Sequence, residues 1–212
     1  MGMPVPEVVV VGGSAGGMRA LQGIFTTLGD IGNAVMCVVL HRSPDHSPLA
    51  DVLQRYTGIP VSEPHTSPWA CPPGTVMVAP AGYHLLVGND RILSQDPHAS
   101  VSPYETAPGV RAHLTLDAPV AYSRPSIDVT FSSAAELLNP VTAVLLTCAN
   151  EDGALGCERV KAAGGRVVLQ DPLTCEAAAA VNATMRRRVA PDHVADPQGI
   201  GSWLAQALKT AR

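Results

Sequence analysis

The sequence of 212 residues lacks any surplus of positive charge. Its 14 Lys and Arg are outnumbered by 18 Asp and Glu, so the formal net charge is −4 and the pI is about 5.9. Proteins that bind nucleic acid or an anionic membrane surface usually carry a basic surplus. We therefore expect neither nucleic acid nor a membrane surface among the partners of this chain.

Long apolar segments and paired cysteines are missing as well. No apolar run is long enough to span a bilayer, and the valine run at 8–11 is too short and lacks the basic flank of a secretory signal. The five cysteines form no C-x-x-C pair, which argues against a disulfide framework or zinc site and favours reduced thiols in a cytoplasmic protein. The histidines show no metal-ligand spacing, so we expect no metal and no cofactor.

The sequence does contain a regular alternation of strand and helix patterns. Apolar runs predict strands at 7–12, 34–41, 74–80, 84–88, 141–147 and 166–170, and helical spacing predicts helices at 17–28, 47–58, 126–138, 153–164, 175–187 and 201–211. This order predicts one doubly wound, three-layer α/β/α domain over residues 1–212, with a mostly parallel sheet and a small antiparallel hairpin.

Two predictions concern the middle of the chain. The hairpin is expected to turn at 89–91 into a strand at 92–95. Residues 96–123, rich in Pro, Ser and His, show no firm period and predict a long surface excursion with one short strand at 111–116.

The first predicted strand runs into a glycine-rich turn at 12–17, GGSAGG. This turn fits G-x-S-x-G, the pattern that exposes a serine hydroxyl between a strand and a helix. The dinucleotide pattern G-x-G-x-x-G cannot be laid over it, and the G-K-[ST] of a Walker A loop is missing. Two interpretations remain: Ser14 is a nucleophile, or the glycines only allow close packing of helix and sheet.

A serine nucleophile needs a base and a group that orients the base. His41 ends the second predicted strand and Asp152 follows a later one, so a parallel sheet would bring both to the edge where Ser14 lies. Taken alone, His41 suits a hydrogen-bonded structural role and Asp152 a helix cap, and Glu151 and Asn150 compete for the orienting role. The chain order Ser, His, Asp differs from that of α/β-hydrolases.

These residues lie in segments that resemble the catalytic domain of the bacterial chemotaxis receptor methylesterases, the CheB family. Five segments carry the resemblance in family order, VVGGSAGG (10–17), VVLHRSP (38–44), SRPSIDVTF (123–131), LLTCANEDGALG (145–156) and VLQDPLTC (168–175). The resemblance implies a Ser14, His41, Asp152 triad that hydrolyses glutamyl γ-methyl esters on cytoplasmic chemoreceptor helices and in some cases deamidates glutamine.

Other positions have expected roles around that triad. Backbone amides at Ala15, His41 or Ala149 are expected to stabilise the oxyanion, with Asn150 in the same region. Arg124 suits either a structural ion pair or contact with an acidic receptor helix. Ser126 and Asp128 are expected to cap a helix.

The chain also departs from the family pattern. Ala15 replaces a threonine, the acid loop reads CANEDG (148–153) in place of Gly-Met-Gly-x-Asp-Gly, and a Met-Pro pair after the cysteine segment is absent. Few residues precede the first strand, so we expect a stand-alone catalytic domain without a receiver domain, active constitutively or controlled by a separate regulator. The alternative is a non-catalytic module that docks on receptors or signalling partners.

Overall fold

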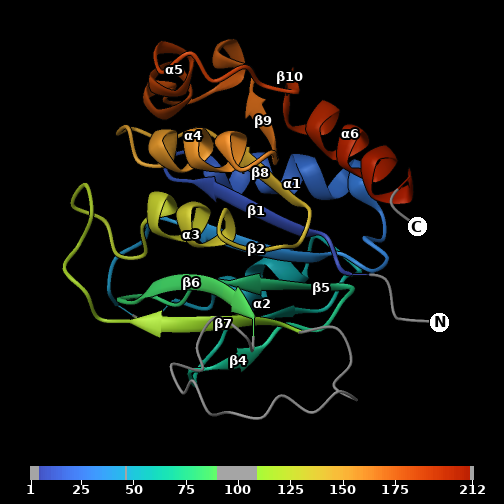
Figure 1. Ribbon diagram of the computed structural model, residues 1–212, viewed down its shortest axis with the longest axis vertical. Helices are drawn as coiled ribbons and strands as arrows, with labels where there is room; N and C mark the ends of the chain where they lie inside the picture. Colours follow the sequence, from blue (N-terminus) through green and yellow to red (C-terminus); the bar gives the residue numbers. More distant parts are fainter. Residues whose placement is uncertain (1–4, 46, 90–108, 211–212) are drawn as a thin grey trace.

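The computed structural model describes residues 5–45, 47–89 and 109–210, and a parallel sheet of seven strands forms its centre (Figure 1). The strand order is β10-β9-β8-β1-β2-β5-β3, and every neighbouring pair is parallel. The strands are β1 (Val8–Gly13), β2 (Val35–Leu40), β3 (Val61–Ser62), β5 (Thr75–Val78), β8 (Val141–Leu145), β9 (Arg166–Gln170) and β10 (His193–Ala195).

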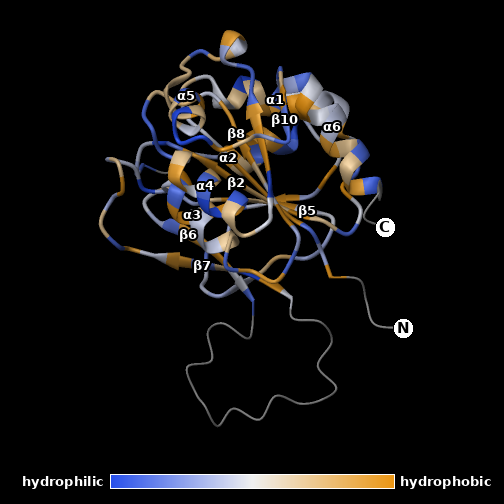
Figure 2. Cartoon of the chain, turned by 45° about the horizontal axis from the view of Figure 1, so that its top comes forward, coloured by the Kyte–Doolittle hydropathy of each residue, from blue (hydrophilic) through white to orange (hydrophobic). Residues whose placement is uncertain are grey.

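Helices cover both faces of this sheet. One face packs against α1 (Gly17–Leu28), α2 (Leu49–Gln54) and α6 (Pro197–Thr210), and the other against α3 (Ile127–Ala134), α4 (Ala154–Ala162) and α5 (Ala179–Arg186). Side chains of β1 alternate between the two cores, as a strand buried on both faces requires. Figure 2 shows the resulting concentration of apolar residues in the strands. None of the helices in the described ranges is long and apolar enough to cross a membrane.

A small antiparallel sheet packs beside α3. It contains β4 (Trp69–Ala70), β7 (Val110–Thr115) and β6 (His84–Asn89), in that order. Thr130 of α3 donates a hydrogen bond to the Leu85 carbonyl of β6 at 2.6 Å, which ties this sheet to the helix. The expected fold class, including the small antiparallel element, is confirmed, and β7 realises the short strand predicted at 111–116. The strand predicted at 92–95 lies outside the described residues.

Several predicted helix bounds were wrong. Helix α5 begins at Ala179 and not at 175, because the Cys148 amide donates to the Ala177 carbonyl at 2.8 Å and draws this segment alongside β8. Helix α3 ends at Ala134, α2 spans only 49–54, and α6 begins at Pro197. Strands β3, β4 and β10 were missed because two or three residues are too short for a sequence period.

The centre of the sheet is a topological switch point. From β1 the chain adds β2, β5 and β3 on one side and β8, β9 and β10 on the other. In such sheets the loops after the central strands diverge and leave a crevice at their carboxyl ends. The turns after β1, β2 and β8 meet there: the Ser14 amide donates to the Thr147 carbonyl at 2.9 Å, and the His41 amide donates to the Gly13 carbonyl at 3.1 Å.

Candidate active site

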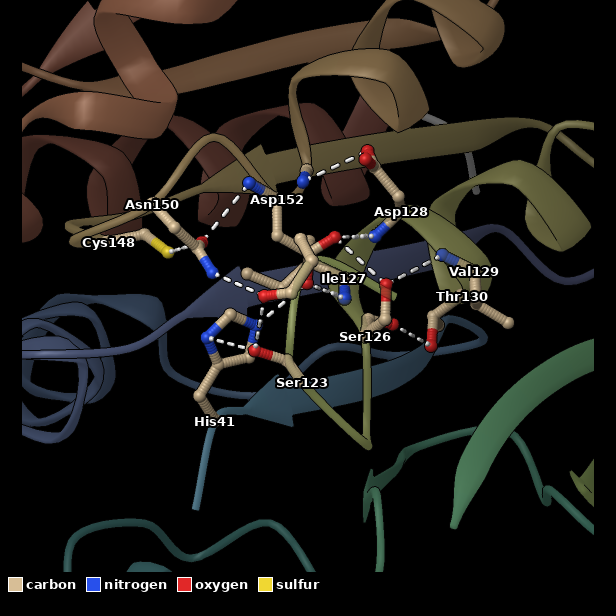
Figure 3. Close-up of polar contacts among 12 residues, drawn as sticks. His41, Ser123, Ser126, Ile127, Asp128, Val129, Thr130, Cys148, Asn150 and Asp152 are labelled. Carbon is tan, nitrogen blue, oxygen red and sulfur yellow. Dashed lines mark hydrogen bonds and ion pairs between the residues drawn. The ribbon is translucent and has the colours of Figure 1, made fainter. Parts of the chain in front are cut away.

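Asp152 lies in the loop after β8 and is buried, with 1% of its surface exposed. Its carboxylate accepts hydrogen bonds from the backbone amides of Ile127 at 2.8 Å and Asp128 at 2.9 Å (Figure 3). The Ser126 hydroxyl donates to it at 2.9 Å, and His41 Nε2 lies 2.7 Å from Oδ2. A carboxylate buried this deeply needs such partners, and the amino end of α3 supplies them with favourable helix polarity.

Asp152 and Asp128 each bind the amino end of a helix other than the one beside them in the chain. Asp128, in the first turn of α3, accepts from the amides of Gly153 at 2.9 Å and Gly156 at 2.7 Å, at the start of α4. Ser126 is the N-cap of α3, as expected, and accepts from the Val129 amide at 3.4 Å. Asp152 therefore binds the amino end of α3, whereas Asp128 binds that of α4. The helix that Asp152 precedes in the chain is not the one it stabilises.

The orientation of His41 follows from its contact with Asp152. A carboxylate can only accept, so Nε2 carries a proton and donates it to Oδ2. The other ring nitrogen, Nδ1, faces the Ser123 hydroxyl at 3.2 Å. When the imidazole is neutral, Nδ1 is the nitrogen that can take a proton from a nucleophile.

The pKa values of this pair diverge. Burial lowers the pKa of His41, but the hydrogen bond to Asp152 and a further contribution from Cys148 outweigh burial and raise that pKa to about 9. Burial raises the pKa of Asp152, yet the bonds from His41, from two amides of α3 and from the Ser126 hydroxyl hold it below its ordinary value. The geometry therefore favours an ionised acid beside an imidazolium at neutral pH.

Ser14 lies next to His41 through the strand register. Gly13 of β1 pairs with Leu40 of β2, and Ser14 and His41 are the residues that follow them. Ser14 is partly exposed, and among the described residues no hydrogen bond involves its hydroxyl. The backbone places the two residues side by side, while the side-chain contact on Nδ1 belongs to Ser123.

The glycines of the turn have packing roles of their own. A Cβ at Gly12 would lie 2.3 Å from a side-chain carbon of Ile127, so only glycine lets β1 approach α3 this closely. Gly16 has φ 77° and is the N-cap of α1, a conformation that glycine adopts without strain. Close packing of helix and sheet is therefore one role of these glycines, and it leaves the role of Ser14 open.

Backbone amides near Ser14 differ in whether they are available to an oxyanion. The amides of Ala15 and Ala149 donate no hydrogen bond within the described part of the chain, and both residues are exposed. The His41 amide is already bonded to the Gly13 carbonyl, so it is not an available donor, which corrects the expectation for that residue. The Thr147 hydroxyl donates to the Ala15 carbonyl at 2.8 Å and so holds the turn in place.

Sequence reasoning missed the hairpin that carries Ser123. Val120 and Ser123 exchange backbone hydrogen bonds of 3.1 and 2.8 Å, and Ala121 and Tyr122 between them have positive φ values of 47° and 65°. Asn150 donates to the Ala121 carbonyl at 3.1 Å and tethers the hairpin to the acid loop. No local pattern marks Ser123, because its contact with His41 joins positions 82 residues apart.

Asn150 and Cys148 brace the acid loop. The Cys148 thiol donates to Asn150 Oδ1 at 3.1 Å, and the Asp152 amide donates to the same oxygen at 3.2 Å. Arg124 lies across the crevice, where Nη1 donates to the carbonyls of Leu116 and Asp117, each at 3.0 Å. Asn150 and Arg124 therefore reach the site region that the sequence suggested, with backbone carbonyls as their hydrogen-bond acceptors.

Comparison with known proteins agrees with this geometry. The family model described as CheB methylesterase matches residues 9–204. A Leptospira interrogans protein provisionally named protein-glutamate methylesterase/protein-glutamine glutaminase is 33% identical over 174 residues, 81% of this chain and 80% of that protein. A Nocardioides protein of the same name is 34% identical over 79% of this chain, which spans 42% of that longer relative.

A solved structure matches the fold as a whole. The crystal structure of the Thermotoga maritima CheB methylesterase catalytic domain superposes with a TM-score of 0.81 at 27% identity. The match covers 95% of this chain and 98% of that one.

Proposed function

Since the chain belongs to the CheB methylesterase family, we propose that it hydrolyses glutamyl γ-methyl esters, with Ser14 as nucleophile, His41 as base and Asp152 as the group that orients the base. One observation carries this proposal. The buried Asp152 carboxylate holds His41 by Nε2 at 2.7 Å, directly beside the exposed turn of Ser14. Relatives named protein-glutamate methylesterase supply the ester as the expected substrate class.

The proposed reaction has two halves. In the first, His41 Nδ1 takes the Ser14 proton, the oxygen attacks the ester carbonyl carbon, and the proton passes to the departing methoxide to form methanol. In the second, Nδ1 takes a proton from water, the hydroxide attacks the acyl carbon, and the glutamyl carboxylic acid leaves as Ser14 regains its proton from His41. The acid then ionises by losing its proton to water. The amides of Ala15 and Ala149 stabilise the oxyanion in both halves.

Ser123 bears on this reaction because it occupies the same nitrogen. For Ser14 to reach Nδ1, its side chain must turn toward His41 while Ser123 moves aside or shares the ring nitrogen as a second contact. Catalytic hydrogen bonds often tighten only once substrate is bound. A substrate that displaces the hairpin of residues 120–123 would bring Ser14 and His41 together.

The proposal extends to the substrate protein and its setting. We propose the cytoplasmic helices of methyl-accepting chemoreceptors as the substrate, with no cofactor. The names of the relatives also include protein-glutamine glutaminase, and a glutamine amide would pass through the same acyl-enzyme with ammonia as the leaving group. A cytoplasmic location and a separate signalling regulator belong to the same proposal.

A second function is favoured by one specific observation. Ser14 has no hydrogen bond to His41 within the described residues, and Ser123 occupies the ring nitrogen instead. This arrangement suits a docking module that binds receptors without hydrolysis. Such a module would bind methylated receptor but release no methanol.

Methanol release from methylated receptor tests the proposal. The purified chain should release methanol, and Ser14→Ala should lower the rate by about 10⁴-fold or more. Ser202→Ala is the matched control, because Ser202 is exposed on α6 and, among the described residues, its hydroxyl bonds only to the Gln198 carbonyl of its own helix. Equal rates for the parent chain and Ser14→Ala would contradict the esterase, and binding of receptor without any release would establish the docking module.

A further inference from the structure

A cavity of about 480 Å³ opens beside His41. Its walls include His41, Arg42, Tyr122, Ser123 and Arg124, and no Asp or Glu is among the described residues that line it. The side chains of two arginines and His41 thus line one small volume, and no carboxylate is among the described residues of its walls. Such a volume attracts an anion.

Arg42 has more hydrogen-bond donors than partners. Its side chain is only 9% exposed, and Nη2 donates to Glu63 Oε1. Nε and Nη1 have no acceptor among the described residues and no contact with solvent. Buried donors without acceptors cost free energy, so a ligand that satisfies them gains affinity.

Arg124 supplies the accessible donors on the same wall. It is partly exposed, and its hydrogen bonds within the described residues use Nη1 alone, to two backbone carbonyls. The edge formed by Nε and Nη2 is not engaged in any of these bonds. Such an edge matches the two oxygens of a carboxylate.

The position of this anion site differs from that of the reacting ester. His41 and Arg42 are neighbours in the chain, but His41 extends to Asp152 after β8 whereas Arg42 extends to Glu63 after β3. An anion held by Arg42 therefore lies beside the carbonyl that Ser14 attacks and not on it. In a protein substrate, that place belongs to a side chain adjacent to the methylated one.

We propose that the cavity is a subsite for the carboxylate of an acidic side chain that neighbours the methyl ester, and that Arg42 determines this specificity. The inference rests on the proposed function, which supplies the ester. The carboxylate accepts from the free edge of Arg124, and the Arg42 guanidinium turns from Glu63 toward the cavity to donate through its unpartnered nitrogens. Glu63 opposes this turn, since it competes for the same guanidinium.

Binding of two peptides to the Ser14→Ala chain tests the subsite without hydrolysis. Both are helical and carry one γ-methyl glutamate; three or four residues away, on the same helix face, one has Glu and the other Gln. We expect the Glu peptide to bind about tenfold more tightly, a difference of about 1.4 kcal/mol. Arg42→Met should reduce this preference to about twofold or less, and Glu63→Gln should increase it.

The control and the outcomes separate the two proposals. Arg55→Met removes an exposed arginine at the end of α2 and should keep the tenfold preference. Arg42→Lys retains the positive charge and should keep part of the preference for the Glu peptide. This variant tests the subsite even if Arg42→Met does not fold. An unchanged preference in a folded Arg42→Met chain, or none in the parent, would overturn the subsite even if methanol release succeeds. A preference lost in Arg42→Met supports it even if methanol release fails.

Discussion

Asp152 and Ser14 follow neighbouring strands, β8 and β1, yet the structure surrounds them in opposite ways. Asp152 is 1% exposed and receives four hydrogen bonds from described residues, two of them from backbone amides of α3. Ser14 is partly exposed, and its hydroxyl makes no hydrogen bond within the described residues. The acid is fixed by many contacts, whereas the proposed nucleophile is held by its backbone alone.

The difference follows from what each group must do. A buried charge without partners would destabilise the fold by several kcal/mol, so its position has to be determined by many bonds. A nucleophile must reach substrate and exchange its proton, so permanent partners would hinder it. We infer that substitutions around Asp152 lower both the stability of the fold and the rate of reaction, whereas substitutions of Ser14 lower mainly the rate.

The largest combined effect on rate and stability is expected from Asp152→Asn. The amide cannot accept all the donors that now meet on the carboxylate, and it leaves His41 without its charged partner. We expect the rate of methanol release to fall by about 10⁴-fold and the free energy of unfolding to fall by about 3 kcal/mol. Initial rates and urea unfolding measure the two effects, and Asp51→Asn, at an exposed position on α2, serves as control. Unchanged stability of Asp152→Asn would contradict the contrast between Asp152 and Ser14.

A smaller effect is expected from pH, because only neutral His41 can take a proton. With its pKa raised to about 9, the rate should rise about fiftyfold from pH 7 to pH 9 and then level off. The stabilisation from the raised pKa is complete below about pH 6.5 and is lost as pH rises toward 9, opposite to the trend in rate. Cys148→Ala should shift the midpoint of the rate profile to lower pH, since the thiol helps to raise this pKa. A plateau already reached below pH 7 would contradict the prediction.

The smallest effect is expected from Ser123→Ala. Removing this hydroxyl frees Nδ1 of His41 but leaves the bond to Asp152 in place, so the rate of methanol release should change by less than about threefold. The comparison with Ser14→Ala is decisive. If Ser123→Ala abolished release and Ser14→Ala did not, the nucleophile would be Ser123 and the proposed triad would be wrong.

The sequence predicted those parts of the fold that depend on local patterns. The four valines and the glycine turn mark β1 and the start of α1, and helical spacing places α1 at its observed bounds. The alternation of strands and helices also predicts a parallel sheet with His41 and Asp152 at the same edge. In the structure, His41 Nε2 lies 2.7 Å from Asp152 Oδ2. Neighbouring residues determine the strands and turns, and the parallel order of the strands brings His41 and Asp152, 111 residues apart, to one edge.

The remaining features depend on side-chain packing between distant segments. No sequence pattern indicates that Nε2 of His41 faces the acid, that Ser123 faces Nδ1, or that residues 175–178 leave the helical path to pair with the loop after β8. Arg42 is similar, since its unmatched donors appear only when Glu63 and the cavity are seen together. These contacts bridge long stretches of sequence and are specified by shape.

The bonds by which Asp152 holds the amino end of α3 and Asp128 that of α4 couple the proposed catalytic residues to the stability of these two helices. Asp152, just before α4, binds amides at the amino end of α3, and Asp128, in the first turn of α3, binds amides at the amino end of α4. If either helix frays at its amino end, the carboxylate bound there is released. A fluctuation that opens the first turn of α3 would also free His41 from its orientation. The fraction of molecules competent for proton transfer is then set by the local opening equilibrium of two helices, and not by the three side chains of the site alone.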